Sequence, residues 1–182
     1  MSHIRPRSPM VRIAAVFAVG LTLASCSSET PEDKREYAVP SSLCGTAVPS
    51  SVLEPLLPAG KKISSVKSGP SGLTRCRLVV DGQVAVTGII EQWESGTTLG
   101  KVAYGTYGLP SGKAKKETSN YIISDSTAVG HASCGKLQKD GHEIFTMIRK
   151  EHGTVGTAAM EKAITEFTSA VSASKQCTES SA

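Results

Sequence analysis

The side chains that could do acid–base chemistry are few and scattered along the chain. His131, His142 and His152 lie in its second half, and Asp125 is a carboxylate that precedes them. A histidine acts as a general base when a neighbouring group orients it and the substrate is within hydrogen-bond reach. His131 with Asp125 is the pair that could assemble such a site. A histidine at a strand edge is more often a structural or surface group, so we expect binding rather than catalysis.

Recognisable catalytic motifs are absent from the sequence. It has no G-x-S-x-G nucleophile turn, no S-x-x-K with its companion motifs and no G-x-x-x-x-G-K-[ST] phosphate loop. Residues 142–146, HEIFT, begin like a zinc-protease helix, but Thr146 stands where the second histidine is required. Glu91 and Glu94 are explained as solvated groups at a strand end. We therefore expect no catalytic residue, no metal and no cofactor.

The most unusual segment for a compact domain is residues 96–116, which hold five glycines, a proline and four lysines. This composition predicts a long loop, with a strand at most around residues 102–104. Such a loop could present aromatic rings and positive charge to a sugar or an anionic polymer. The alternative is a tyrosine pair that closes the sheet edge beside a mobile lysine-rich turn. The candidate binding residues are Trp93, Tyr104, Tyr107, Lys113 and Lys115.

The elements that must position these residues are predicted by turn chemistry and apolar periodicity. Asp81-Gly82 lies between two runs rich in β-branched residues, which predicts a tight hairpin. Three more strands are expected over residues 120–126, 128–134 and 142–151. Ser51 stands three residues before Glu54, the spacing of a capping box, and predicts a helix of one or two turns. The buried face of the hairpin is expected to hold Cys76, Leu78, Val80, Val84, Val86 and either Ile89 or Ile90.

The clearest helix signal covers residues 157–177. Met160, Ile164, Phe167 and Val171 follow one another at steps of four, three and four, which places them on one face of a helix. Because that face must be covered, the preceding strands are its expected partner. The predicted fold is a single α+β domain over residues 41–182, an antiparallel sheet with the long helix packed on one face.

Residues 1–25 have the layout of a secretory signal. Three arginines precede the uncharged run IAAVFAVGLTL, which is far shorter than the about 20 residues of a membrane-spanning helix. Residues 23–26, LASC, resemble a bacterial lipobox, which implies cleavage before Cys26 and a diacylglyceryl group on its thiol. The alternative is an ordinary signal peptide with a chance cysteine. Translation could start at Met1 or at Met10. The polar residues 26–40 are expected to form a flexible tether.

Charge and cysteine content limit the partners. Without residues 1–25 the chain has 17 basic and 16 acidic side chains, which gives no basic footprint for nucleic acid. Four cysteines remain beside Cys26, and an even number in an exported chain predicts two disulfides. Three pairings are possible, and zinc is disfavoured because no C-x-x-C occurs. We favour Cys44 with Cys76 and Cys134 with Cys177, since each pair would staple one half of the chain.

Taken together, these features resemble the small cell-envelope lipoproteins of actinobacteria. The residues that carry the likeness are LASC at 23–26, a polar tether, LCG at 43–45, LLPAG at 56–60 and a helix that closes on Cys177. The resemblance implies a lipid-anchored protein on the extracytoplasmic face of the cell membrane, with a ligand- or partner-binding role. An envelope protein or a glycan is the expected partner. The alternatives are a structural or assembly lipoprotein of a membrane complex and an envelope enzyme.

Overall fold

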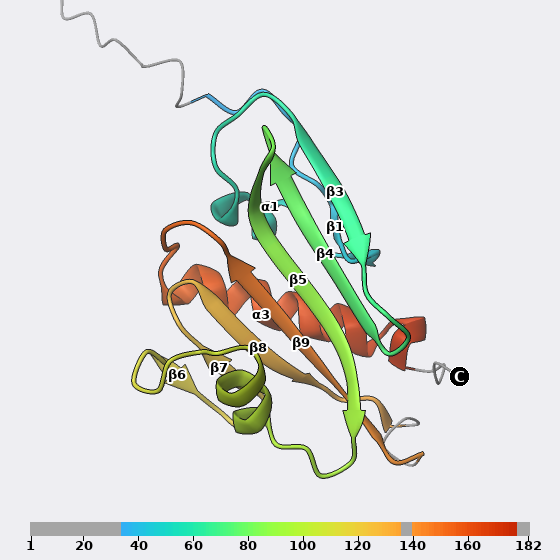
Figure 1. Cartoon of the computed structure of the whole chain (residues 1–182). Helices are drawn as coiled ribbons and strands as arrows, with labels where there is room; N and C mark the ends of the chain where they lie inside the picture. The colour runs from blue at the N-terminus through green and yellow to red at the C-terminus, as the bar shows by residue number, and fades with distance from the viewer. Residues whose placement is uncertain (1–33, 136–139, 178–182) are drawn as a thin grey trace, which may run out of the picture.

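The computed structural model describes residues 34–135 and 140–177, and its centre is one antiparallel sheet of seven strands (Figure 1). The strand order across the sheet is β3-β4-β5-β9-β8-β7-β6. Helix α3 (Thr157–Ser172) packs on one face of this sheet, so the predicted α+β domain is confirmed. Within the described residues no helix is both long and apolar enough to span a membrane. The strands are β3 (Ile63–Ser68), β4 (Leu73–Val80), β5 (Gln83–Glu94), β6 (Lys116–Glu117), β7 (Tyr121–Ile123), β8 (Thr127–Ala132) and β9 (His142–Lys150).

The face covered by α3, called here the helix face, holds the larger apolar cluster. The four predicted residues Met160, Ile164, Phe167 and Val171 are all fully buried. Gly130 of β8 lies so close to the helix that a Cβ there would be 2.3 Å from Oγ1 of Thr168. The helix is shorter than predicted, because it ends at Ser172 and a separate 3-10 turn, η4 (Lys175–Cys177), follows.

The hairpin predicted at Asp81-Gly82 joins β4 and β5. Both residues have positive φ, 48° and 85°, as a type I′ turn requires. The carboxylate of Asp81 also accepts hydrogen bonds from the backbone N–H groups of Lys61 and Lys62, at 2.8 and 2.9 Å, which lowers its pKa. These bonds fix the start of β3, a polar edge strand that apolar periodicity did not reveal.

A β-bulge in this hairpin corrects the predicted core face. The register shifts between Leu78 and Val79, so that Leu78 faces Val86 and Val79 faces Val84. Val86 is therefore buried on the helix face, whereas Val84 lies on the opposite face. The prediction that Val84 shares the face of Val86 is wrong, because the bulge inserts one residue and reverses the alternation.

Both predicted disulfides are present, and they fasten flanking segments to the sheet. Cys44 lies in the turn between the short strands β1 (Ser42–Leu43) and β2 (Thr46–Ala47), and its disulfide to Cys76 ties this turn to β4. The bond from Cys134, two residues after the end of β8, to Cys177 ties this part of the chain to η4. In the loop-entropy description each bond stabilises the fold by roughly 4 kcal/mol before strain is subtracted.

The short helix forms where it was expected but begins differently. Helix α1 (Ser50–Leu53) continues as the 3-10 turn η2 (Glu54–Leu56), and Pro49 occupies the N-cap without a side-chain cap. The predicted capping box is therefore wrong, since Ser51 lies inside the helix. The hydroxyl of Ser50 instead donates to the carbonyl of Val39.

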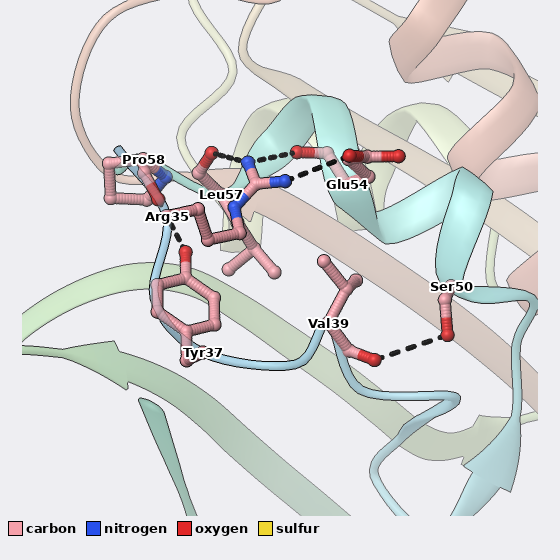
Figure 2. A network of polar contacts seen from close by, with 7 residues as sticks. All are labelled: Arg35, Tyr37, Val39, Ser50, Glu54, Leu57 and Pro58. Carbon is pink, nitrogen blue, oxygen red and sulfur yellow. Dashed lines mark hydrogen bonds and ion pairs between the residues drawn. The ribbon is translucent and has the colours of Figure 1, made fainter. Parts of the chain in front are cut away.

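The N-terminal segment contacts the domain earlier than predicted (Figure 2). The guanidinium of Arg35 donates to the side chain and carbonyl of Glu54 and to the carbonyl of Leu57, at 3.0, 3.1 and 2.7 Å. The hydroxyl of Tyr37 donates to the carbonyl of Pro58. The folded part thus begins before Ser41, because side chains of the expected tether find backbone acceptors on η2 and on the two residues that follow it. Residues 1–33, with the signal segment and Cys26, and residues 136–139 lie outside the described part.

Candidate functional site

The face opposite α3, called here the open face, is covered only in part. Residues 102–104, expected to form a strand, lie in the π-helical segment η3 (Lys101–Thr106), where the N–H of Tyr107 bonds to the carbonyl of Val102. That expectation is wrong because Val102 and Ala103 are buried together against the open face of the sheet. In Figure 1, η3 lies over the β7 and β8 end of the sheet. Segment 96–116 is therefore largely a cover, and the rest of the face stays accessible.

A row of polar side chains crosses the accessible part of the open face. Arg77 of β4 faces Thr87 of β5, and Thr87 faces Arg149 of β9. Directly paired residues share a face, and neighbouring strands are about 4.8 Å apart, so the two arginines flank Thr87 at Cα positions about 10 Å from each other. Arg75, two residues before Arg77, projects from the same face. Pairing of the strands thus brings three arginines together around one hydroxyl.

These arginines line a hollow of about 570 Å³, called here the arginine hollow. Its floor is formed by buried side chains of β5 and β9, of which Thr87 is 7% exposed and Met147 2% exposed. The end of η3 supplies one wall through Tyr107. Polar walls over a partly apolar floor are typical of ligand sites.

Two hydrogen bonds hold Arg149 in the hollow. Its guanidinium donates to the backbone carbonyl of Tyr107 and, at 3.4 Å, to the hydroxyl of Thr127. Tyr107 is itself fixed, because its hydroxyl donates to the carboxylate of Glu91 at 2.6 Å. Burial, then the hydrogen bond and charge of Glu91, raise the pKa of Tyr107 far above its ordinary value. The phenol therefore stays neutral and acts as a support for Arg149.

The arginine hollow carries an excess of positive charge. Among the described residues, no carboxylate forms an ion pair with any of the three arginines. Glu151 is the one acidic side chain in the lining, and its carboxylate accepts a hydrogen bond from the hydroxyl of Thr87. The three arginines and Glu151 together give the lining two net positive charges.

A second hollow of about 570 Å³, called here the lysine hollow, adjoins the first. Tyr107, Arg149 and Glu151 line both of them. Lys113, Lys115 and Asp125 contribute to the lysine hollow only. The accessible surface is thus a basic trough with two connected ends.

The five candidate binding residues are divided by this arrangement. Tyr107 lies between the two hollows, and Lys113 and Lys115 line the lysine hollow. Trp93 and Tyr104 line neither of them and pack on the apolar cluster under η3. The ammonium of Lys101 lies 5.8 Å from the centre of the Trp93 ring, and the hydroxyl of Tyr104 donates to Glu117.

His131 and Asp125 have different partners at opposite ends of β8. The Nε2 atom of His131 is 3.2 Å from a carboxylate oxygen of Glu143, without the alignment of a hydrogen bond, and its ring stacks on Phe145. Asp125 accepts a hydrogen bond from the hydroxyl of Thr157 at 2.7 Å. The fold therefore does not assemble the acid–base pair that the sequence suggested.

The other titratable candidates are also dispersed. His142 begins β9, Glu94 ends β5, and exposed His152 lies at the margin of the arginine hollow. In residues 34–135 and 140–177, no three or more His, Cys, Asp or Glu side chains are grouped so that they could hold a metal ion.

Sequence reasoning missed the three arginines of the hollow. Arg75 and Arg77 alternate with Cys76 and Leu78, so their shared face was visible in LTRCRLVV. Their approach to Arg149 was not visible, because it depends on the pairing of β4 and β9 with β5. Comparison of the chain with protein-family models, with curated proteins and with solved structures finds no match.

Proposed function

We propose that the chain is a lipid-anchored binding protein of the cell envelope, which holds a ligand in the arginine hollow without changing it covalently. The observation that carries this proposal is the convergence of Arg75, Arg77 and Arg149 on one hollow, unpaired with any carboxylate of the described residues. Guanidinium groups keep their protons at neutral pH, so they supply charge and directed donors but no proton transfer.

The proposed location, on the extracytoplasmic face of the membrane, rests on the first 26 residues and on the disulfides. The signal-like segment and the lipobox-like LASC favour export and lipidation of Cys26. Two disulfides support a compartment outside the reducing cytosol. Because the carbonyl of Lys34 already accepts a hydrogen bond from the N–H of Gly60, residues 27–33 would bridge at most about 25 Å between lipid and domain.

The binding function is tested with a panel of ligand classes on the full-length chain. Melting temperature is measured at constant ionic strength with simple phosphates, carboxylates, sugars and amines. Val84→Trp places a large ring in the arginine hollow without removing charge, since Val84 lines it. The matched control is Ser65→Trp, on the exposed edge strand β3 and on the helix-face side of the register. At least one class should stabilise the wild type and the control but not Val84→Trp.

Two results would contradict this function. The first is a panel in which no class stabilises the wild type, or in which Val84→Trp responds like the control. The second is chemical conversion of a bound ligand, detected by mass spectrometry of the ligand recovered after incubation. Such conversion would favour the enzyme alternative.

The address is tested separately with Cys26→Ser. We expect the variant to leave the membrane fraction or to keep its signal segment uncleaved. Normal processing together with unchanged membrane retention would contradict lipid anchoring and would leave the binding proposal intact.

A further inference from the structure

The donors of the arginine hollow exceed what a single carboxylate can accept. Each guanidinium presents a planar fork of N–H groups, and three of them face the same space with the hydroxyl of Thr87 below. A carboxylate offers two oxygens, whereas a phosphate monoester offers three terminal oxygens. Three forks around three oxygens can each form a charge-assisted pair.

The charge of the lining points to the same group. Three arginines and Glu151 leave two net positive charges. A phosphate monoester carries between about −1.5 and −2 charges at neutral pH. It balances that excess while Glu151 stays in the hollow, and most of the three positive charges once Glu151 has turned away. A singly charged carboxylate would leave one guanidinium without a counter-charge.

The carboxylate of Glu151 occupies the position in which an anionic ligand could bind. Its carboxylate is the group to which the Thr87 hydroxyl donates, between the strands that carry Arg77 and Arg149. Glu151 is exposed and follows the end of β9, so its side chain can turn away without disturbing the sheet. An incoming anion would replace it as the acceptor for Thr87.

We propose that the arginine hollow binds the phosphate group of a small phosphate monoester, with Arg77 and Arg149 on either side of the group and Thr87 beneath it. This inference rests on the function proposed above and names the chemistry of the ligand. Glu151 acts as an internal competitor for the same position.

The test is isothermal titration calorimetry on the full-length, disulfide-bonded chain in detergent at neutral pH and constant ionic strength. The probes are inorganic phosphate and glycerol phosphate, with acetate and succinate as carboxylate controls. We expect both phosphates to bind more tightly than either carboxylate. Arg77→Gln should weaken phosphate binding about tenfold or more, as the loss of a charge-assisted pair predicts.

Two further variants make the result specific. Lys67→Gln removes one positive charge on the neighbouring strand, at a position paired with Cys76 and so on the opposite face, and should change affinity less than about twofold. Glu151→Gln removes the internal competitor and should tighten binding severalfold. If Arg77→Gln does not fold by circular dichroism, Arg75→Gln takes its place with the same expected direction.

The inference is overturned if neither phosphate binds, if succinate binds as tightly, or if Arg77→Gln and Lys67→Gln behave alike. Vesicles of phosphatidylglycerol, compared with phosphatidylcholine, distinguish a lipid source. Binding to these vesicles without binding of the small phosphates would also overturn it. If neither phosphate binds, but a sugar or carboxylate binds the wild type and not Val84→Trp, the binding function stands and the phosphate assignment alone is removed. If no probe binds at all, both the binding function and the phosphate assignment are contradicted.

Discussion

The two faces of the sheet are stabilised in different ways. The helix face is closed by the continuous apolar stripe of α3 and fastened by both disulfides, and its polar contact between Thr146 and Thr168 is fully internal. The open face is closed over only part of its area by η3, and its remainder holds arginines. The first arrangement is typical of a core, and the second is typical of a binding surface on a rigid support.

This difference separates residues that maintain the fold from residues available for function. Residues of β5 on the helix face alternate with residues on the open face, since side chains alternate along a strand. Ile90 thus belongs to the core of the helix face, whereas Ile89 belongs to the cluster of the open face. Substitutions on the two faces should therefore affect different measurements.

The largest effect is expected in the core of the helix face. Phe167→Ala removes a fully buried ring and should lower the free energy of unfolding by about 3 to 5 kcal/mol. Glu166→Ala, one residue earlier on the exposed side of α3, should change it by less than about 0.5 kcal/mol. Chemical denaturation measures both variants. Similar values for the two would contradict the packing of α3 on the sheet.

Two glycine substitutions test how tightly α3 and η3 pack at the two faces of the sheet. Gly130→Ala places a Cβ against Thr146 and Thr168 and should destabilise the protein by about 1 to 3 kcal/mol. Gly105→Ala, in η3, meets nothing within 4 Å and should be neutral or stabilise by up to about 1 kcal/mol. Thermal melting distinguishes them, and a reversed order would mean that η3 packs more tightly than α3.

Two tyrosine substitutions compare the stability contributed by a buried and by an exposed hydroxyl on the open face. Tyr107→Phe leaves the carboxylate of Glu91 without its donor and should cost about 1 to 3 kcal/mol. Tyr104→Phe loses an exposed hydrogen bond to Glu117 and should cost less than about 0.5 kcal/mol. Urea denaturation at neutral pH measures the pair. Equal costs would show that the wall formed by Tyr107 does not support Arg149.

The same tyrosine predicts a pH dependence of stability. The pKa of Tyr107 is raised from 10.0 by burial and by Glu91. The folded phenol thus keeps its proton at a pH where the unfolded phenol has lost it, and its contribution to stability is full below about pH 10 and declines as the pH rises above it. The difference in unfolding free energy between wild type and Tyr107→Phe should therefore shrink from about pH 9 to about pH 11. A constant difference would contradict the raised pKa.

The smallest effect on stability is expected in the arginine hollow. Arg77→Gln relieves repulsion from its two neighbouring arginines and should change the unfolding free energy by less than about 0.5 kcal/mol in ligand-free buffer. Thermal melting without phosphate measures this change. A loss of more than about 1 kcal/mol would mean that Arg77 maintains the fold, and the separation of the two faces would fail.

The sequence predicts the helix face better than the open face for a physical reason. Met160, Ile164, Phe167 and Val171 repeat along one helix, and Asp81-Gly82 encodes its turn locally. Each of these signals is contained in one short segment. The pairing found for the four cysteines is the one favoured among the three that the sequence left open.

The open face depends on contacts between distant segments. Arg77 and Arg149 meet only through β5, and Val102 takes a helical form because it covers the sheet. Arg35 lies in a polar stretch that favours disorder, yet its side chain is held by the carbonyls of Glu54 and Leu57. Local composition contains no information about such partners. The candidate site was therefore recovered only through Tyr107 and the lysines Lys113 and Lys115.

The central claim is that the open face, and not the helix face, binds a phosphate group. Amide chemical shifts of the full-length chain, recorded during titration with inorganic phosphate, test it most directly. We predict saturable changes at Arg77, Thr87 and Arg149, with Ile164 and Phe167 unchanged. Changes that do not saturate, or that spread evenly over exposed lysines on both faces, would contradict the claim.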